Sequence, residues 1–166
     1  NRLYIASKII ALGNLLGSKI GNVYSTSHIY DVRPEHEPRY RAFKEDHSDV
    51  SVVIQGPIST KDDFTLNSAL NFIEAYPKSE IVISTWDDTP TTLLDKFREI
   101  GLRVITSSKP TPGPQNINLQ LMSTQKGVSA VSTQSKYILK MRTDQRFDLD
   151  RDIISYFKSR NWIRNK

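Results

Sequence analysis

The chain has 166 residues, of which 37% are hydrophobic and 25% are charged, so it is long enough for one domain with a sizeable core. It contains no Cys, which excludes disulfide bonds and thiolate metal sites. The net charge of +5 and the sequence pI near 9.4 favour nucleic acid, an anionic membrane surface or a phosphorylated small molecule as partner; the alternative is a mildly basic soluble protein.

Residues 1–48 differ from the rest of the chain and are predicted to form a helix and a linker. Ile5, Ile9, Leu12 and Leu16 recur at helical spacing, as in an amphipathic helix that packs on the domain or lies on a membrane surface. The later stretch "YDVRPEHEPRYRAFKEDHSD" is polar and rich in proline, which is typical of a linker. No apolar run reaches the length of about 18 residues that predicts a membrane-spanning helix. The chain does not begin with Met, so we expect a piece of a longer protein.

The regular part of the chain begins with a strand, a helix and a second strand. "SVVIQGPI" is an apolar run closed by Gly56 and Pro57, as in a buried strand that ends in a turn. "EIVISTWDD" has the same character and is predicted to be the second strand. Between them, Thr60 or Asp62 is the expected helix cap, and the apolar face of that helix carries Leu66, Ala69, Leu70 and Ile73.

The same alternation continues to the end of the chain. Thr89 is predicted to cap a helix with Pro90 in its first position, and Gly101 to end it, with Leu93, Phe97 and Ile100 on the buried face. "LRVITSS" and "KYILKM" are the third and fourth strands, and the loop "KPTPGP" follows the third. The helix before the fourth strand is predicted to turn Ile117, Leu121, Thr124 and Val128 inward. A last helix from Asp150 to Arg160 is predicted to bury Ile153, Ile154 and Phe157.

This order predicts an α/β fold with a parallel, Rossmann-type sheet and helices on both faces. Ligands of such sheets bind outside the carboxyl ends of the strands. A dinucleotide enzyme would show a Gly-x-Gly-x-x-Gly stretch after the first strand, and a phospho-receiver domain would show acidic residues where Gln55 stands, so both are disfavoured. The polar strand ends are Gln55-Gly56-Pro57, Thr85-Trp86-Asp87-Asp88, Ser107-Ser108-Lys109 and Arg142-Thr143-Asp144.

The stretch "YILKMRTDQRF" begins as a buried strand and then carries Lys140, Arg142, Asp144 and Arg146 on alternate positions. One interpretation is a phosphate site, in which the Asp144 carboxylate holds a divalent cation and the basic side chains neutralise a diphosphate. The alternative is a salt-bridged strand end in which Asp144 pairs with Arg142 or Arg146.

Four stretches, "VVIQGPI", "SEIVISTWDD", "NINLQLMSTQKGV" and "KYILKMRTDQRF", in this order and spacing, resemble the WavE-type lipopolysaccharide-synthesis family, bacterial glycosyltransferases of GT-A-like fold. The resemblance covers about residues 50 to 150. It implies transfer of a sugar from a nucleotide-sugar donor to a glycan or lipid-linked glycan acceptor, with residues 49–166 as the donor-binding, N-terminal half of the domain. Carried over by position, Gln55, Gly56 and Pro57 lie by the nucleotide, Trp86 and Asp87 by the base or ribose, and Arg142 and Asp144 by the diphosphate.

Several of these residues have a second interpretation. Trp86 is equally a packing residue, and Gln55 can bond to the backbone rather than to a nucleotide. Asn116 and Gln120 share a helical ridge after "TPGP", where a helix N-terminus can face an anion or simply be solvated. "TDQ" offers one carboxylate where GT-A enzymes usually show Asp-x-Asp, so Asp144 is expected to bind Mg²⁺ or Mn²⁺ weakly.

The resemblance implies a cytoplasmic enzyme, with peripheral association at the inner face of the bacterial inner membrane. We expect the catalytic base and the acceptor site beyond residue 166, in the half of a GT-A domain that follows the metal-binding acid. The rival interpretation is a non-catalytic nucleotide-binding or interaction module of the same fold. Nucleic-acid binding is suggested by charge alone, without the aromatic and basic pattern of stacking sites, and we expect no nucleic-acid partner.

Overall fold

The computed structural model describes residues 42–147, 149 and 151–159. The predicted amphipathic helix and the first part of the predicted linker lie outside these residues. The predicted strands and the helices between them all lie inside.

Strands and helices alternate along the chain as the sequence predicts. The strands are β1 (Val50–Gln55), β2 (Glu80–Trp86), β3 (Arg103–Ser107) and β4 (Tyr137–Arg142). The helices are α2 (Phe64–Ala75), α3 (Thr91–Glu99), α4 (Ile117–Ser129) and α5 (Ile153–Ser159), with 3-10 turns η2 (Lys61–Asp63) and η3 (Pro114–Asn116). The strand order is β3-β2-β1-β4, and each neighbouring pair is parallel. The predicted fold class, α/β with a Rossmann-like parallel sheet, is confirmed.

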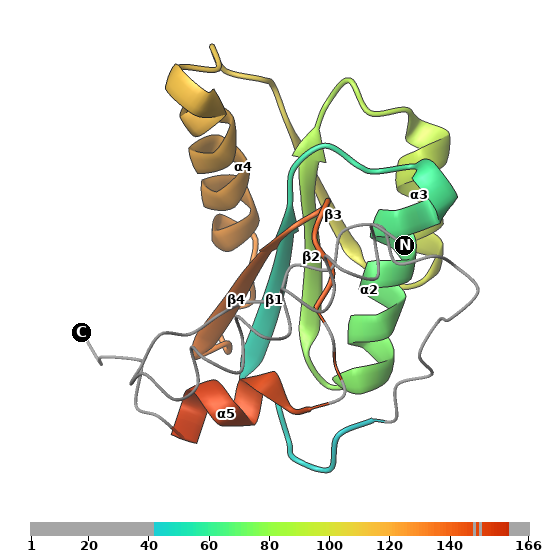
Figure 1. Cartoon of the computed structure of the whole chain (residues 1–166), viewed down its shortest axis with the longest axis vertical. Coiled ribbons are helices and arrows are strands. Elements are labelled where there is room, and N and C mark those ends of the chain that lie inside the picture. The colour runs from blue at the N-terminus through green and yellow to red at the C-terminus, as the bar shows by residue number, and fades with distance from the viewer. Residues whose placement is uncertain (1–41, 148, 150, 160–166) are drawn as a thin grey trace, which may run out of the picture.

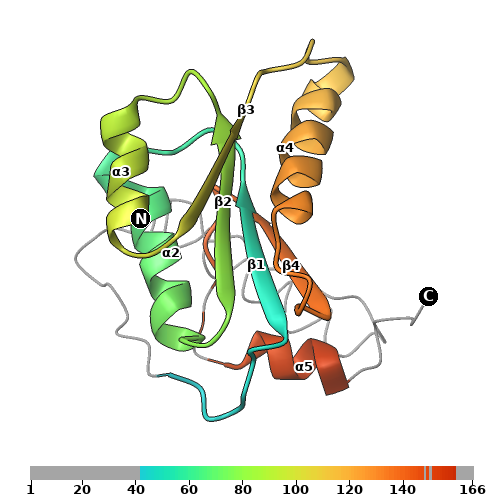
Figure 2. The same cartoon turned by 180° about the vertical axis from the view of Figure 1, so that it is seen from behind.

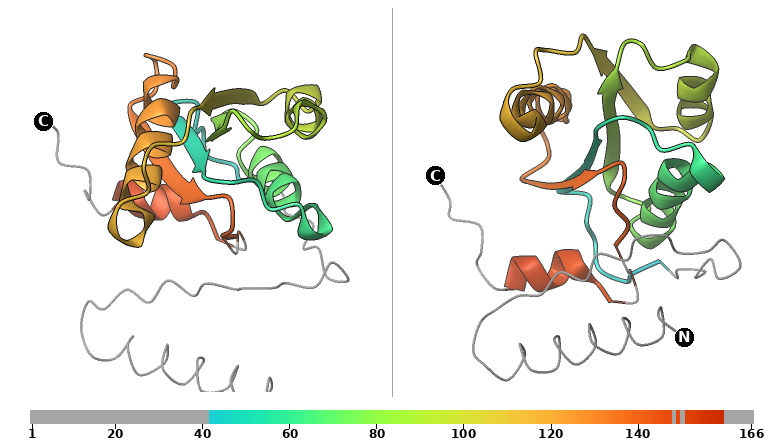
Figure 3. Two further views of the ribbon diagram at one scale, coloured as in Figure 1. Left: turned by 90° about the horizontal axis from the view of Figure 1, so that it is seen from above. Right: turned by 45° about the horizontal axis from the view of Figure 1, so that its top comes forward.

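Helices cover both faces of the sheet (Figure 1). α2 and α3 lie on one face and α4 on the other, as the views from behind and from above show (Figures 2 and 3). α5 lies at the amino ends of β1 and β4, where Ile154 and Phe157 line a groove with Val50 and Tyr137. Because both of its faces are covered, β1 is buried along its whole length and has a continuous apolar run.

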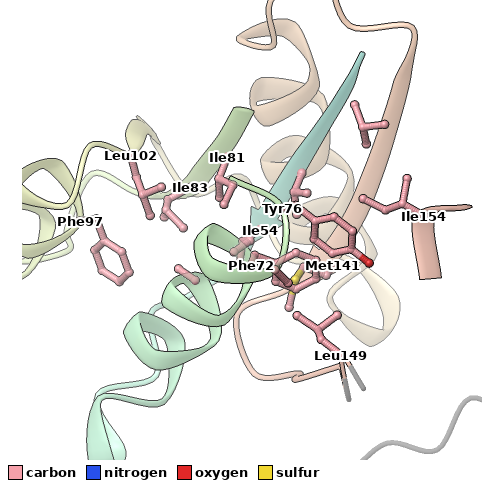
Figure 4. Close-up of a cluster of buried hydrophobic side chains, with 14 residues drawn as sticks. Ile54, Phe72, Tyr76, Ile81, Ile83, Phe97, Leu102, Met141, Leu149 and Ile154 are labelled. Carbon is pink, nitrogen blue, oxygen red and sulfur yellow. The ribbon is translucent and has the colours of Figure 1, made fainter. Parts of the chain in front are cut away.

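The main hydrophobic core lies between the sheet and the layer of α2 and α3, and it extends to Ile154 of α5 (Figure 4). Phe72, Tyr76 and Phe97 are at most 1% exposed. They pack on the sheet side chains that alternate onto this face, which include Ile54 and Ile83. The predicted inward face of α3 is confirmed by Leu93, Phe97 and Ile100, which join this core. Of the predicted face of α2, Leu66, Ala69 and Ile73 join it, whereas Leu70 is only partly buried and lies outside the cluster.

The ends of two helices differ from the prediction. Neither Thr60 nor Asp62 caps α2, because the turn η2 intervenes and the helix starts one residue after Asp63, which makes no side-chain cap bond. Pro90 is the N-cap residue of α3 rather than its first helical residue. Gly101 follows α3 with a φ of 85°, a left-handed conformation that glycine adopts without a steric penalty, so the predicted end of α3 is confirmed.

The predicted inward face of α4 is wrong. Ile117, Leu121 and Val128 are 45%, 61% and 39% exposed, whereas Ser123 and Gly127 are buried. The reason is the close approach of α4 to the sheet: a Cβ on Gly127 would lie 2.5 Å from Val53 Cγ1. A helix this close selects small residues for its inner face, and the large apolar residues turn outward.

Candidate functional site

A pocket of about 400 Å³ opens at the carboxyl ends of the strands. Its walls come from the ends of β1, β2 and β4, from the loops after β3 and β4, and from η3 with the first half of α4. The residues that line it are Gln55, Gly56, Pro57, Trp86, Lys109, Gln115, Asn116, Leu119, Gln120, Ser123, Arg142, Thr143 and Asp144.

The pocket lies where the order of the strands reverses. β1 has β2 on one side and β4 on the other, and open α/β sheets bind ligands outside the carboxyl ends of the strands at such a point. Gln55 is the register partner of Ser84 in β2 and of Arg142 in β4. These side chains therefore leave the sheet on the same face, which is the face that α4 covers.

Thr143 holds the ends of β1 and β4 together. Its backbone N–H donates to the Gln55 carbonyl at 3.0 Å, and its Oγ1 donates to the Pro57 carbonyl at 2.6 Å. Its own carbonyl accepts a hydrogen bond from Thr65 Oγ1 at 2.9 Å. A Cβ on Gly56 would lie 2.8 Å from Thr143 Oγ1, and the φ of Gly56 is 126°. The turn after β1 therefore requires glycine on both grounds.

The Gln55 side chain bonds to α4 rather than to the backbone of its own turn. Ser123 Oγ donates to Gln55 Oε1, and Ser84 Oγ donates to the Ser123 carbonyl at 2.7 Å. Ser123 is fully buried and Gln55 is 2% exposed, so this contact lies beneath the pocket wall. It joins the last residue of β1 to the middle of α4.

Arg142 and Asp144 form a charge pair at the pocket. Arg142 Nε donates to Asp144 Oδ1 at 2.8 Å, and Arg142 Nη2 donates to Oδ2 at 2.6 Å. These hydrogen bonds hold the pKa of Asp144 below its usual value, against the opposing effect of partial burial. The side chains are 41% and 50% exposed, so a ligand can reach both groups. The predicted pairing of Asp144 with Arg142 is thus present together with the predicted placement of both at a pocket.

Trp86 and Lys109 come from the ends of β2 and β3. Trp86 is only 3% exposed, so it is a packing residue that also contributes to the pocket wall. Lys109 forms an ion pair of 2.5 Å with Asp88, and both side chains are about half exposed. Lys109 therefore adds a second positive charge beside the pocket.

The wall opposite the strand ends is formed by η3 and the first turns of α4. Gln115 and Asn116 have φ values of 51° and 59°, which are uncommon for residues other than glycine. The loop before them is held by Asn118, whose Nδ2 donates to the Thr111 carbonyl at 2.9 Å. Asn116 and Gln120 both line the pocket, although Asn116 precedes α4 in a left-handed conformation and so does not share a helical ridge with Gln120 as predicted.

Three residues that the sequence associates with this site lie elsewhere. Asp87 turns away after β2 and accepts a hydrogen bond from Ser108 Oγ at 2.7 Å. Lys140 is exposed on β4 opposite Val53, two residues and so about 7 Å before Arg142. The Arg146 guanidinium packs 4.6 Å from the centre of the Phe64 ring and bonds to α2.

Several pocket residues were not singled out by the sequence. The sequence places Lys109 and Thr143 at strand ends without indicating a role, and it does not indicate Gln115, Leu119 or Ser123 as site residues. Helical periodicity follows the large apolar residues of α4 and therefore does not indicate its inner face of small residues. The spacing of Ser123 and Gly127, four residues apart, is the signal that would have found it.

The described residues contain no group of three or more His, Asp or Glu side chains arranged to hold a metal ion. At the pocket, Asp144 is the carboxylate among the lining residues. Mg²⁺ is commonly bound through one or two carboxylates together with phosphate oxygens of the substrate, so one carboxylate fits a cation that arrives with a diphosphate. None of the described helices is long and apolar enough to cross a membrane.

The fold and this pocket define an α/β protein with a pocket at the switch point of a parallel sheet. A family model described as WavE lipopolysaccharide synthesis matches residues 50–159, so the chain belongs to this family. Membership indicates a role in lipopolysaccharide synthesis. No curated protein and no solved structure matches the chain significantly.

Proposed function

We propose that this chain is the donor-binding part of a bacterial glycosyltransferase of GT-A-like fold, which takes a sugar from a nucleotide-sugar donor in the synthesis of lipopolysaccharide or another surface polysaccharide. The observation that carries the proposal is the pocket at the switch point, which combines an aromatic wall, amide side chains and two basic residues. A nucleotide sugar needs all three, because it presents a flat base, polar ribose and base edges, and a diphosphate.

The uncharged part of the pocket suits the nucleoside. Trp86 supplies an apolar wall against which a base or ribose can lie. Gln55, Asn116 and Gln120 bring amide groups, which donate and accept hydrogen bonds and so recognise base and ribose edges. A volume of about 400 Å³ falls within the usual range for small-molecule sites.

The charged part suits the diphosphate. Arg142 presents a planar guanidinium, which binds phosphate oxygens with two parallel hydrogen bonds, and Lys109 adds a point charge. During transfer the bond between sugar C1 and the diphosphate oxygen breaks, and the bonding electrons leave with the diphosphate. The acceptor oxygen bonds to C1 and loses its proton to a base. The charge that develops on the diphosphate strengthens its attraction to Arg142, which therefore lowers the barrier.

A divalent cation belongs to the proposal as a weakly bound partner of the diphosphate. Asp144 would supply one oxygen ligand once the diphosphate has taken over the Arg142 hydrogen bonds. The cation, Mg²⁺ or Mn²⁺, would neutralise phosphate charge. The acceptor is proposed to be a glycan or a lipid-linked glycan, in keeping with the family, at the inner face of the inner membrane.

Thermal unfolding in the presence of UDP, GDP, CDP or CMP, with and without Mg²⁺, tests the proposal. A nucleotide that binds the folded state at a hundredfold excess over its Kd stabilises it by about 2.7 kcal/mol. We expect a rise in Tm with at least one of them, and a smaller rise in an Arg142→Met variant. If none of the nucleotides changes the Tm of the folded protein, the donor site is disproved.

A turnover assay separates the proposal from the rival, a non-catalytic nucleotide-binding module. That module would bind a nucleotide sugar without consuming it, so the sugar would stay attached when an acceptor extract is added. Release of the nucleoside diphosphate, measured with the full-length enzyme, supports the transferase.

A further inference from the structure

We propose that Ser123 is a positioning residue that fixes the side-chain amide of Gln55, so that its N–H donors face the pocket and select an acceptor oxygen on the ligand. The statement about the ligand rests on the proposed function, whereas the positioning of Gln55 does not. Ser123 itself lies behind Gln55, fully buried on the inner face of α4.

The direction of the hydrogen bond follows from the single proton of the Ser123 hydroxyl. Its Oγ lies near Gln55 Oε1 and 2.8 Å from the Leu119 carbonyl, with the Gln120 carbonyl farther away at 3.4 Å, and it can donate to one of them. Leu119 and Ser123 are both interior residues of α4, where the backbone N–H of a residue donates to the carbonyl four residues earlier. The Leu119 carbonyl thus already has a partner in the helix.

The hydrogen bonding of Gln55 Oε1 differs from that of the Leu119 carbonyl. It belongs to a side chain that is 2% exposed, and Ser123 is the hydrogen-bond partner that the described residues offer it. A buried carbonyl without a partner destabilises the fold by about 1–3 kcal/mol. The proton of Ser123 therefore goes to Gln55 rather than to the helix carbonyl.

This arrangement decides what the pocket presents. With Oε1 turned to Ser123, the amide nitrogen of Gln55 lies on the other side of the group, and among the described residues none accepts a hydrogen bond from it. Its neighbour across the strands is Arg142, whose Nε and Nη2 donate to Asp144. The Gln55 amide thus presents N–H donors to the pocket, so the ligand atom that fits beside it is an oxygen acceptor, such as a nucleobase carbonyl or a phosphate oxygen.

The position of α4 makes the contact possible. Gly127 lets the helix approach the sheet, and the Ser84 hydroxyl bonds to the Ser123 carbonyl at 2.7 Å. Both features fix the distance between Ser123 and β1. A longer side chain at residue 127 would lift the helix and separate Ser123 from Gln55.

The experiment compares wild type, Ser123→Ala, Gln55→Met and the double variant, with Ser129→Ala as a matched control at the exposed end of the same helix. The first readout is ¹⁵N relaxation of the Gln55 side-chain amide, which needs no ligand. We expect an order parameter near the value of about 0.85 typical of rigid groups in wild type and Ser129→Ala, and below about 0.6 in Ser123→Ala. An unchanged order parameter in Ser123→Ala overturns the positioning role.

The second readout is the affinity for a nucleoside diphosphate, for the matching nucleoside and for inorganic pyrophosphate. Ser123→Ala should bind about tenfold more weakly than wild type to those ligands whose oxygen accepts the Gln55 hydrogen bond. Tenfold is the effect expected of one hydrogen bond. In the Gln55→Met background the same substitution should have no effect, because Ser123 acts through Gln55. A tenfold loss that persists in that background overturns the proposal. If wild type binds none of the three while the relaxation result holds, the donor function fails and the positioning role stands.

Discussion

The guanidinium of Arg142 donates two hydrogen bonds to the carboxylate of Asp144, at 2.8 and 2.6 Å, beside a pocket that both residues line. The pair leaves Asp144 charged and occupies the donors that a diphosphate would use. An anion that binds to these two N–H groups must therefore replace Asp144 as their partner.

The exchange predicts that metal affects nucleotide binding in wild type but not in Asp144→Asn. In EDTA, Asp144→Asn should bind a nucleoside diphosphate several-fold more tightly than wild type, because the negative charge that competes for Arg142 is gone. With Mg²⁺, wild type should gain affinity and the variant should not. Isothermal titration of both proteins under both conditions measures this. If EDTA leaves the wild-type affinity unchanged, Asp144 has no metal role.

In the full-length enzyme, Asp144→Asn should reduce the rate of sugar transfer by about a hundredfold, roughly 2.7 kcal/mol of transition-state stabilisation. The melting temperature should change little, since an exposed ion pair contributes at most about 1 kcal/mol. A purely structural salt bridge predicts the reverse, with activity retained and stability reduced. Sugar transfer and thermal unfolding measured on this variant decide between them.

Arg142→Lys should weaken the binding of a nucleoside diphosphate by about tenfold or more, although the charge is kept. Lysine is a point charge and cannot replace the two parallel hydrogen bonds of a guanidinium. Lys140→Met is the matched control, because Lys140 is exposed on the same strand and lies outside the pocket. A loss with Lys140→Met and none with Arg142→Lys would mean that only the overall charge matters.

Gly127→Ala should destabilise the protein by about 1–3 kcal/mol, measured by urea unfolding. Alanine stabilises a helix by about 1 kcal/mol relative to glycine. Its Cβ at residue 127, however, would lie 2.5 Å from Val53 Cγ1 and 3.0 Å from Ser84 Cβ, and this overlap outweighs the gain. Leu121→Ser, on the exposed side of the same helix, should change stability by less than about 0.5 kcal/mol. A large loss of stability with Leu121→Ser would mean that Leu121 is on the buried face, as periodicity predicts.

Acid should destabilise the fold in part through Asp152, whose Oδ2 lies 2.9 Å from His47 Nε2 and whose Oδ1 accepts a hydrogen bond from the Ser155 backbone N–H at 3.0 Å. Burial raises the pKa of Asp152, but hydrogen bonds from Ser155 and His47 outweigh it, and the net pKa lies below the ordinary value of 3.8. A carboxyl with a depressed folded-state pKa stabilises the protein above its unfolded-state pKa, and this stability is lost as the pH falls through the folded-state value. Free energies of unfolding between pH 7 and pH 2 should therefore fall less steeply for Asp152→Asn than for wild type. Parallel curves would show that Asp152 contributes nothing.

The sequence predicted the elements of this fold because its strongest signals are local. Continuous apolar runs marked β1 and β2, and the glycine after α3 marked its end. Most of the predicted site also lies together at the pocket, since the carboxyl ends of parallel strands meet at one edge. What periodicity could not predict is the distance between α4 and the sheet. That distance depends on Gly127, and it brings Ser123 to Gln55 while Leu121 faces outward.

The central claim is that a nucleoside diphosphate binds at the switch point between β1 and β4. ¹H–¹⁵N spectra of the ¹⁵N-labelled chain during titration with UDP, GDP or CDP test it most directly, because they report binding and its location together. We predict shifts concentrated at Gly56, Trp86, Asn116 and Thr143. Residues of α5, which lies at the amino ends of the strands, should change little. Shifts confined to other parts of the chain, or no shifts with any of the nucleotides, would contradict the claim.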